Sequence, residues 1–123
     1  KVDEMPIVAG LYINRLRRNI PLQADPTVKY AVGNFSLKRI LNKHLNTASP
    51  YNTYLNTGLP PGPIRIPSKS AINAVLNYRS HNYLYMCAKE DFSGKHNFAR
   101  TLTEHNANAR RYQAALNKLN IKK

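Results

Sequence analysis

A proline- and glycine-rich stretch, residues 49–64, constrains the fold of this chain more than any other feature. Four of the eight prolines lie in it. Each proline fixes φ at about −65° and favours an extended conformation in the residue before it. Gly58 and Gly62 allow the positive φ values that sharp joints require. The stretch therefore predicts a stiff, irregular segment that a helix could not replace.

The side chains of this stretch suggest a binding surface. No charged residue occurs from Ser49 to Ile64, and the tyrosines Tyr51 and Tyr54 flank Asn52 and Thr53. Aromatic rings cover the apolar C–H face of a sugar, while amide and hydroxyl groups bind its polar substituents. The stretch also suits a long connector that holds two helices apart. Long ordered loops are often functional, and the residues alone leave both interpretations open.

Length and charge limit the classes of partner. The 123 residues fit one domain with one modest core. With 19 basic and 6 acidic residues, the net charge of +13 attracts polyanions: nucleic acid, an anionic lipid surface, or the peptide carboxylates of peptidoglycan. No zinc-finger spacing, RNP-like strand or convincing helix-turn-helix supports nucleic acid. Most basic residues fall on expected helix surfaces, where a solvated face is their commonest meaning.

The residues present disfavour metal, disulfide and cofactor chemistry. Cys87 is the only cysteine, so no disulfide can form within the chain, and its apolar neighbours predict a buried, unreactive thiol. The four histidines lack the paired spacing of a zinc site. No glycine-rich loop offers a phosphate cradle. We expect neither a metal nor a cofactor.

The ends of the sequence carry no targeting or membrane signal. No run approaches the roughly 18 apolar residues of a membrane span, and the first residues lack the pattern of a signal peptide. The sequence begins with Lys1 and not with Met. We therefore expect a processed or excised part of a longer protein.

Hydrophobic periodicity predicts a mainly helical α+β domain with a late β-hairpin. The expected helices cover residues 6–18, 27–32, 37–45 and 69–77, and a last helix begins at 101. The expected strands are 82–89 and 96–100, joined by a turn. Ser36, Ser68 and the Thr101–Glu104 capping box mark three helix starts. The helix over 69–77 should face the core with Ala71, Ile72, Val75 and Leu76.

Most remaining polar residues have a local structural explanation. Asp25 before Pro26 indicates a turn or an N-cap. His44 lies in a last helical turn, where a cation is favourable. Glu90 and Asp91 are expected to be solvated carboxylates of the hairpin turn.

Three further polar residues differ in what the sequence predicts for them. Packing or capping is expected for Asn14, and packing for His105. Gln23 is different, because an amide between Leu22 and Ala24 has no local capping role. It is therefore a candidate for binding a ligand.

Three separated groups of residues together resemble a known family. The first is SPYNTYLNTGLPPGPI at 49–64. The second combines LYINRL at 11–16 with PLQADPTV at 21–28. The third combines NYLY at 82–85, HNF at 96–98 and EHN at 104–106. Their order and spacing over nearly the whole chain are similar to those of the endolytic murein transglycosylases of the MltG (YceG-like) family.

The resemblance implies a peptidoglycan lytic transglycosylase. Such an enzyme cleaves MurNAc–GlcNAc bonds within glycan strands and leaves 1,6-anhydroMurNAc ends, using one glutamate and no cofactor. Residues 1–123 match the C-terminal part of a YceG-like catalytic domain. The family's acid, in an E-x-E-T motif, would lie before Lys1, so this fragment alone is expected to be inactive. Glu4 matches a second glutamate with a structural or supporting role.

The resemblance also implies the substrate contacts and the surroundings. It puts Gln23 beside the cleft, and the expected substrate-binding residues are Gln23, Tyr51, Asn52, Thr53, Tyr54 and Pro60. The implied partners are peptidoglycan glycan strands, with cell-wall synthesis proteins as further candidates and no nucleic acid. The implied location is the bacterial cell envelope, periplasmic or on the outer face of the inner membrane, with membrane contact only through an N-terminal anchor outside this sequence.

A non-catalytic basic module that binds the cell wall or nucleic acid is the competing interpretation. Glycoside hydrolysis usually takes two carboxylates, and each of the six here has a local structural explanation. In this interpretation, the chain binds such a polymer without cleaving it.

Overall fold

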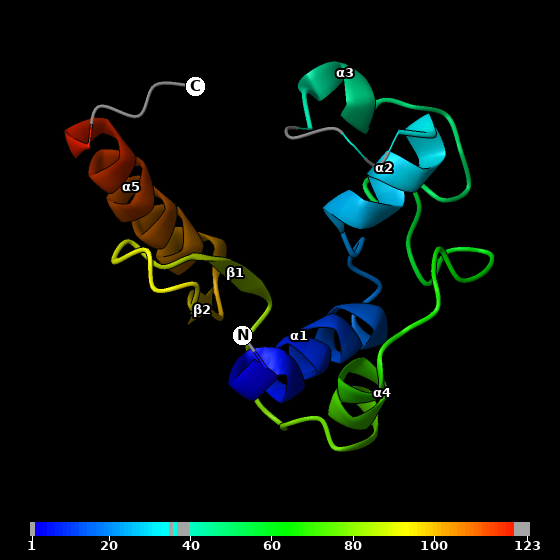
Figure 1. Ribbon diagram of the computed structural model, residues 1–123, viewed down its shortest axis with the longest axis horizontal. Helices are drawn as coiled ribbons and strands as arrows, with labels where there is room; N and C mark the ends of the chain where they lie inside the picture. The colour runs from blue at the N-terminus through cyan, green and yellow to red at the C-terminus, as the bar shows by residue number, and fades with distance from the viewer. Residues whose placement is uncertain (1, 35, 37–39, 120–123) are drawn as a thin grey trace. The chain divides into compact units, whose positions relative to one another are not determined.

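The computed structural model describes residues 2–34, 36 and 40–119. Its helices and single late hairpin form the expected α+β class (Figure 1). By their contacts the residues form two compact units. The first combines Lys1–Asn14 with Lys69–Lys123, and the second is Arg15–Ser68. Each unit has its own small set of buried residues.

Helix α1 (Met5–Arg17), preceded by the short 3-10 helix η1 (Val2–Glu4), begins and ends within one residue of the prediction. In the first unit it packs against the chain that follows α4. The side-chain amide of Asn14 donates to the carbonyls of His81 at 2.8 Å and Tyr83 at 3.0 Å. The packing role predicted for Asn14 is confirmed.

Helix α4 (Lys69–Leu76) lies beside α1 (Figure 1), and residues of both helices line a common pocket. The predicted core face of α4 is largely wrong. Only Ala74 is buried, whereas Ile72, Val75 and Leu76 are 46%, 56% and 74% exposed. An apolar stripe identifies one side of a helix, but it does not determine whether another element covers that side.

Strands β1 (Tyr85–Ala88) and β2 (His96–Ala99) form the expected antiparallel hairpin, with shorter strands than predicted. Tyr85 lies opposite Ala99, and Ala88 lies opposite His96. The Lys89 N–H donates to the Lys95 carbonyl at 2.9 Å and closes the turn. The hairpin runs along helix α5 (Leu102–Lys118) (Figure 1).

The start of α5 follows the predicted capping pattern with one shift. The Thr101 hydroxyl accepts from the Glu104 N–H at 3.2 Å. The Glu104 carboxylate accepts from the Arg100 N–H at 3.0 Å, one residue earlier than in a standard capping box. Farther along, the ring of His105 stacks on Tyr85 with 5.2 Å between centroids, as expected for a packed histidine.

Helix α2 (Asp25–Val32) opens the second unit and ends where expected, at Gly33 with φ 83°. Helix α3 (Asn42–Leu45) is only one turn long. The predicted helix over 37–45 is therefore wrong at Ile40 and Leu41, which are not helical, while residues 37–39 lie outside the described residues. Ser36 caps no described helix, because its hydroxyl donates to Asn34 Oδ1 at 2.6 Å.

His44 lies in the last turn of α3, as predicted, and it also makes a hydrogen bond to the start of that helix. The Leu41 N–H donates to His44 Nδ1 at 2.9 Å. A ring nitrogen that accepts a hydrogen bond carries no proton, so the imidazole acts as an acceptor at the start of α3.

The cores of both units are small and partly polar. Buried apolar side chains among the described residues are Leu11, Leu22, Val28, Ala74, Leu84 and Ala99. Buried polar or charged ones are Glu4, Arg15, Thr27, Asn52 and Thr53. No helix within residues 2–34 and 40–119 is long and apolar enough to cross a bilayer.

Candidate functional site

The proline-rich segment lies in the second unit and is irregular, as predicted. From Asn46 to Ser68 the chain forms turns and bends without helix or strand. Such a segment needs hydrogen bonds from its side chains, because its backbone groups lack a regular ladder. Asn52 and Thr53 supply them.

Asn52 fastens the loop to the end of α3. Its side chain is 0% exposed. The amide nitrogen donates to the carbonyls of Leu45 at 3.0 Å and Thr47 at 2.9 Å. The amide oxygen accepts from the Tyr54 N–H at 2.9 Å. The side-chain hydrogen bonds of Asn52 are thus made within the protein, and its predicted contact with a substrate stays a prediction.

Thr53 fastens the loop to the start of α2. It is 1% exposed, and its hydroxyl accepts from the Ala24 N–H at 2.9 Å and lies 2.7 Å from the hydroxyl of Thr27. Its carbonyl accepts from the Gln23 N–H at 3.2 Å. Thr53 therefore positions the loop against residues 23–27 and does not present its hydroxyl to solvent. Sequence reasoning missed Thr27 as its partner.

Gln23 is exposed and has an unusual backbone conformation. Its φ is 52°, in the left-handed region that residues other than Gly, Asn and Asp rarely adopt. Such a conformation costs about 1–3 kcal/mol and occurs often at functional sites. The Thr53 carbonyl holds the Gln23 backbone in place, while the side chain extends from the loop–α2 junction. In the described structure, the Gln23 side chain does not cap the start of α2.

The two tyrosines of the loop are partly exposed. The Tyr54 hydroxyl donates to Asp25 Oδ1 at 2.8 Å. The ring of Tyr51 lies 4.6 Å from that of Tyr30, at 45° between planes. Pro60 is half-buried farther along the loop. Tyr51, Tyr54 and Pro60 are the loop residues from the predicted set that remain accessible.

Asp25 has a different role from the one predicted. The N-cap of α2 is Ala24, which offers no side-chain cap, and Asp25 is the first helical residue. Its negative charge near the helix N-terminus is favourable. Its carboxylate also orients Tyr54, a contact between residues 29 positions apart that the local sequence could not indicate.

Glu4 lies in the first unit, where it pairs with His96. The carboxylate accepts from the His96 N–H at 3.1 Å and lies 3.0 Å from His96 Nδ1. Burial alone would raise the pKa of Glu4, but the hydrogen bonds and the charge of His96 outweigh burial and lower it. A carboxyl group with a lowered pKa is ionised at neutral pH and therefore has no proton to donate as a general acid. The pair suits the predicted supporting role.

The turn carboxylates are held more firmly than expected. Glu90 accepts from Asn97 at 2.9 Å and from Arg111 at 3.0 Å. A backbone hydrogen bond and these side-chain bonds lower the pKa of Glu90, and hydrogen bonds from Ser93 lower the pKa of Asp91. Every resolved pKa shift of a carboxyl group in the described residues is therefore downward, opposite to that of a general acid.

Cys87 and the histidines offer no further chemistry. Burial raises the pKa of the half-buried Cys87 thiol, which disfavours the reactive thiolate. Within the described residues, no group of three or more His, Cys, Asp or Glu side chains could hold a metal ion.

The sequence model of the YceG-like family matches residues 1–111. The chain belongs to the YceG-like family. The match covers α1, the loop, the hairpin and most of α5, so both units of this YceG-like chain contain family sequence.

Proteins similar to this YceG-like chain include two endolytic murein transglycosylases. The one from Bacillus subtilis is 44% identical over 110 residues, which cover 89% of this chain and 30% of that protein. The one from Streptococcus pneumoniae is 37% identical over 112 residues, covering 88% and 20%. The chain thus spans less than a third of the length of either relative.

A crystal structure of a YceG-like protein from Listeria monocytogenes has a similar fold. It superposes with a TM-score of 0.76 at 44% identity, covering 81% of this chain and 32% of that one.

Proposed function

We propose that this chain forms part of the catalytic domain of a peptidoglycan lytic transglycosylase, with residues 1–123 corresponding to the C-terminal part of that domain. Its role is to hold the glycan strand. Membership of the YceG-like family and similarity to two endolytic murein transglycosylases support this function. The observation that carries it is the loop of residues 49–64, which we call the braced loop because buried hydrogen bonds of Asn52 and Thr53 fasten it. The braced loop contains no charged residue and presents Tyr51 and Tyr54.

In this proposal, one group of residues contacts the substrate and a second group positions the loop. Tyr51, Tyr54 and Pro60 offer apolar surface to sugar rings, and the Gln23 amide hydrogen-bonds their polar substituents. Asn52 and Thr53 act as positioning residues that fix the loop. A platform held by buried hydrogen bonds loses little conformational entropy when the glycan binds.

The proposed reaction breaks the bond between MurNAc C1 and the oxygen of the following GlcNAc. A carboxylic acid protonates that leaving oxygen. The MurNAc C6 hydroxyl then attacks C1, and its proton returns to the carboxylate as the 1,6-anhydro ring closes. No water is consumed, and one carboxyl group is sufficient.

The acid itself is proposed to lie outside this sequence. A general acid benefits from a raised pKa, whereas the shifted carboxyl groups Glu4, Glu90 and Asp91 all have lowered ones. Glu4, paired with His96, serves as support. The proposed site of action is the cell envelope, where the net charge of +13 favours the acidic peptides of peptidoglycan.

Loop variants of the full-length product of the gene test this function. Tyr54→Ala and Asn52→Ala should lower cleavage of purified peptidoglycan by at least about tenfold, because substrate positioning is lost. Tyr54→Phe keeps the ring and should lose less. Lys43→Ala, an exposed residue of α3 in the same unit, should stay within about twofold of the unaltered protein.

Two results would decide against the proposal. Equal losses of cleavage activity in Tyr54→Ala and Lys43→Ala would show that the loop is not a substrate-binding surface. Binding of all variants to peptidoglycan without any cleavage would favour the non-catalytic basic module. Urea unfolding of Asn52→Ala separates a loss of fold from a loss of positioning.

A further inference from the structure

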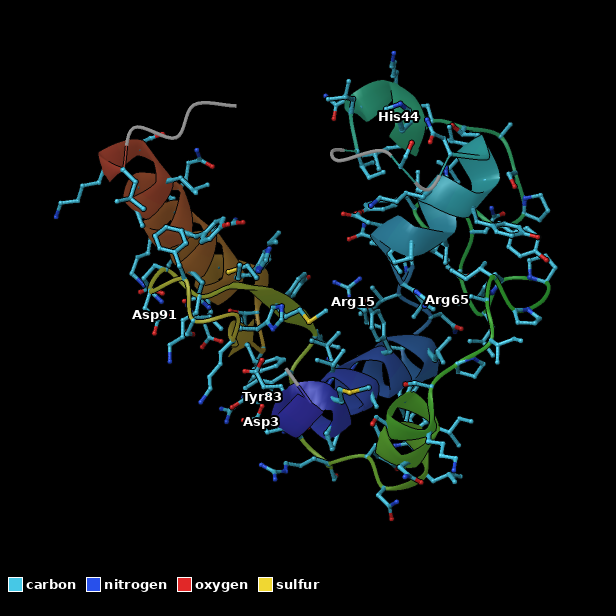
Figure 2. The ribbon with its side chains drawn as sticks, in the orientation of Figure 1. Asp3, Arg15, His44, Arg65, Tyr83 and Asp91 are labelled. Atoms are coloured by element: carbon cyan, nitrogen blue, oxygen red, sulfur yellow. The ribbon has the colours of Figure 1, made fainter. Side chains whose placement is uncertain are left out.

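A second pocket lies at the turn of the hairpin, within the first unit. Its volume is about 320 Å³, and its lining includes Lys89, Phe92, Gly94, Lys95, His96 and Tyr112. They come from the β1–β2 turn, the start of β2 and the middle of α5. Figure 2 labels Asp91 in this turn, next to α5. None of these residues belongs to the braced loop.

Two lysines, Lys89 and Lys95, line the pocket. Neither Lys89 nor Lys95 lies within ion-pair distance of a carboxylate in the described residues, where the ion pairs are His96–Glu4 and Arg111–Glu90. Of the acids in the turn, Asp91 accepts from the Ser93 N–H at 3.0 Å and interacts electrostatically with Lys89 beyond ion-pair distance. Two ammonium groups beside one pocket attract an anion.

The pocket also has an aromatic wall. The rings of Phe92 and Tyr112 lie 5.9 Å apart at 56°. Phe92 is 46% exposed and has φ 57°, a left-handed conformation that is rare for a bulky residue. The fold thus exposes the large apolar ring of Phe92 to solvent at the pocket, although its turn is strained. An apolar group of a ligand would cover it.

His96 contributes a polar edge to the same pocket. Because a carboxylate only accepts hydrogen bonds, the Nδ1 atom of His96, which lies 3.0 Å from Glu4 Oε1, carries a proton. The Glu4 contact thereby fixes the orientation of the ring. Nε2 is left as the ring nitrogen that Glu4 does not use.

We propose that this pocket binds the carboxylate-bearing end of a short peptide, with the carboxylate at Lys89 and Lys95 and the adjacent aliphatic carbons on Phe92 and Tyr112. A phosphate would use the lysines but leave the rings uncovered. Under the proposed function, the peptide is a stem that hangs from the glycan strand. The site then recognises the peptide part of peptidoglycan, whereas the loop holds the glycan strand.

Binding is measured by NMR chemical-shift titration of the 123-residue chain. The probe is N-acetylmuramoyl dipeptide with a free terminal carboxylate, and its matched control has that carboxylate replaced by a carboxamide. The free acid should shift the amides of Gly94 and Lys95 and bind at least about tenfold more tightly than the amide. Inorganic phosphate forms a third arm.

Variants separate charge, ring and fold. Lys89→Met with Lys95→Met should weaken binding at least about tenfold, whereas Lys69→Met, an exposed residue at the start of α4, should leave it unchanged. Phe92→Asn tolerates the left-handed conformation, so it should weaken binding without lowering stability. Equal binding of acid and amide, or phosphate binding as tightly as the acid, would overturn the proposal.

Because binding is measured without cleavage, the two proposals can fail separately. Binding of the free acid at Gly94 and Lys95 upholds the pocket even if the full-length protein cleaves no peptidoglycan. Cleavage without such binding leaves the transglycosylase function and removes the pocket from it.

Discussion

At the scale of single residues, Gln23 combines strain with exposure. Its left-handed backbone would suit glycine better, so Gln23→Gly should leave the free energy of unfolding unchanged or raise it by up to about 1 kcal/mol. If the amide binds glycan, the same variant should lower peptidoglycan cleavage by about tenfold in the full-length product. Urea unfolding and a cleavage assay measure the two effects.

Asn19 provides the matched control for Gln23. It has φ 55° in the same unit and is exposed. Asn19→Gly should change stability similarly or less and leave cleavage unaltered. A Gln23→Gly variant that cleaves peptidoglycan as well as Asn19→Gly would show that Gln23 does not bind the substrate.

Glu4 makes stability depend on pH in the acid range. Its pKa in the folded chain lies below the ordinary value of 4.5. The carboxylate therefore stabilises the fold fully above about pH 4.5, and this contribution is lost as the pH falls through the folded pKa. Glu4→Gln should cost about 1.5–3 kcal/mol at about pH 6, because charge-assisted hydrogen bonds from His96 are replaced by weaker ones.

The two proteins are compared by urea unfolding at about pH 6 and about pH 3. The difference between Glu4→Gln and the unaltered chain should shrink at the lower pH, because the unfolded chain then binds a proton at Glu4 and the stabilisation by the ionised carboxylate is lost. A constant difference would mean that shape, and not ionisation, makes Glu4 matter.

At the scale of elements, Gly10 controls how α1 packs. A Cβ at this position would meet the carbonyl of Arg79 and lie 2.8 Å from His81 Nε2. Alanine favours a helix over glycine by about 1 kcal/mol, so a free helix surface would gain from Gly10→Ala. The contact with the backbone should reverse the sign and destabilise the chain by about 1–3 kcal/mol. Thermal unfolding that shows stabilisation would contradict this packing.

The sequence predicts those elements whose signals are local. Periodicity and end signals give α1, α2 and α5, and the alternation of 82–89 gives the hairpin. The exposed side of α4 could not be predicted, because a stripe such as Ile72, Val75 and Leu76 carries no record of what covers it. The single turn of α3 depends on contacts of Leu41 with His44 that compete with a longer helix.

The candidate site was predictable as a stretch but not as a set of roles. The composition of residues 49–64 marks the loop and its tyrosines. It does not reveal whether an amide or hydroxyl bonds to a ligand or to the protein itself. Asn52 bonds to Leu45 and Thr47, and Thr53 bonds to Ala24, through contacts that only the folded chain shows. The left-handed φ of Gln23 likewise has no signal in its residue type.

At the scale of the whole molecule, charge and binding surfaces belong together. The net charge of +13 draws the chain towards acidic polymers, while the uncharged loop offers contact to neutral sugars. In the proposal above, the pocket at Lys89 and Lys95 adds local selectivity for carboxylates. Peptidoglycan offers both chemistries in one polymer.

Mass spectrometry of the products from purified peptidoglycan tests this account most directly. The full-length product of the gene and the 123-residue chain are incubated with it separately. We predict that the full-length product releases fragments with 1,6-anhydroMurNAc ends, lighter by one water than hydrolysed ends, and that the 123-residue chain releases none. Hydrolysed ends, or no fragments from the full-length product, would contradict the transglycosylase function, and release by the 123-residue chain would contradict an acid outside it.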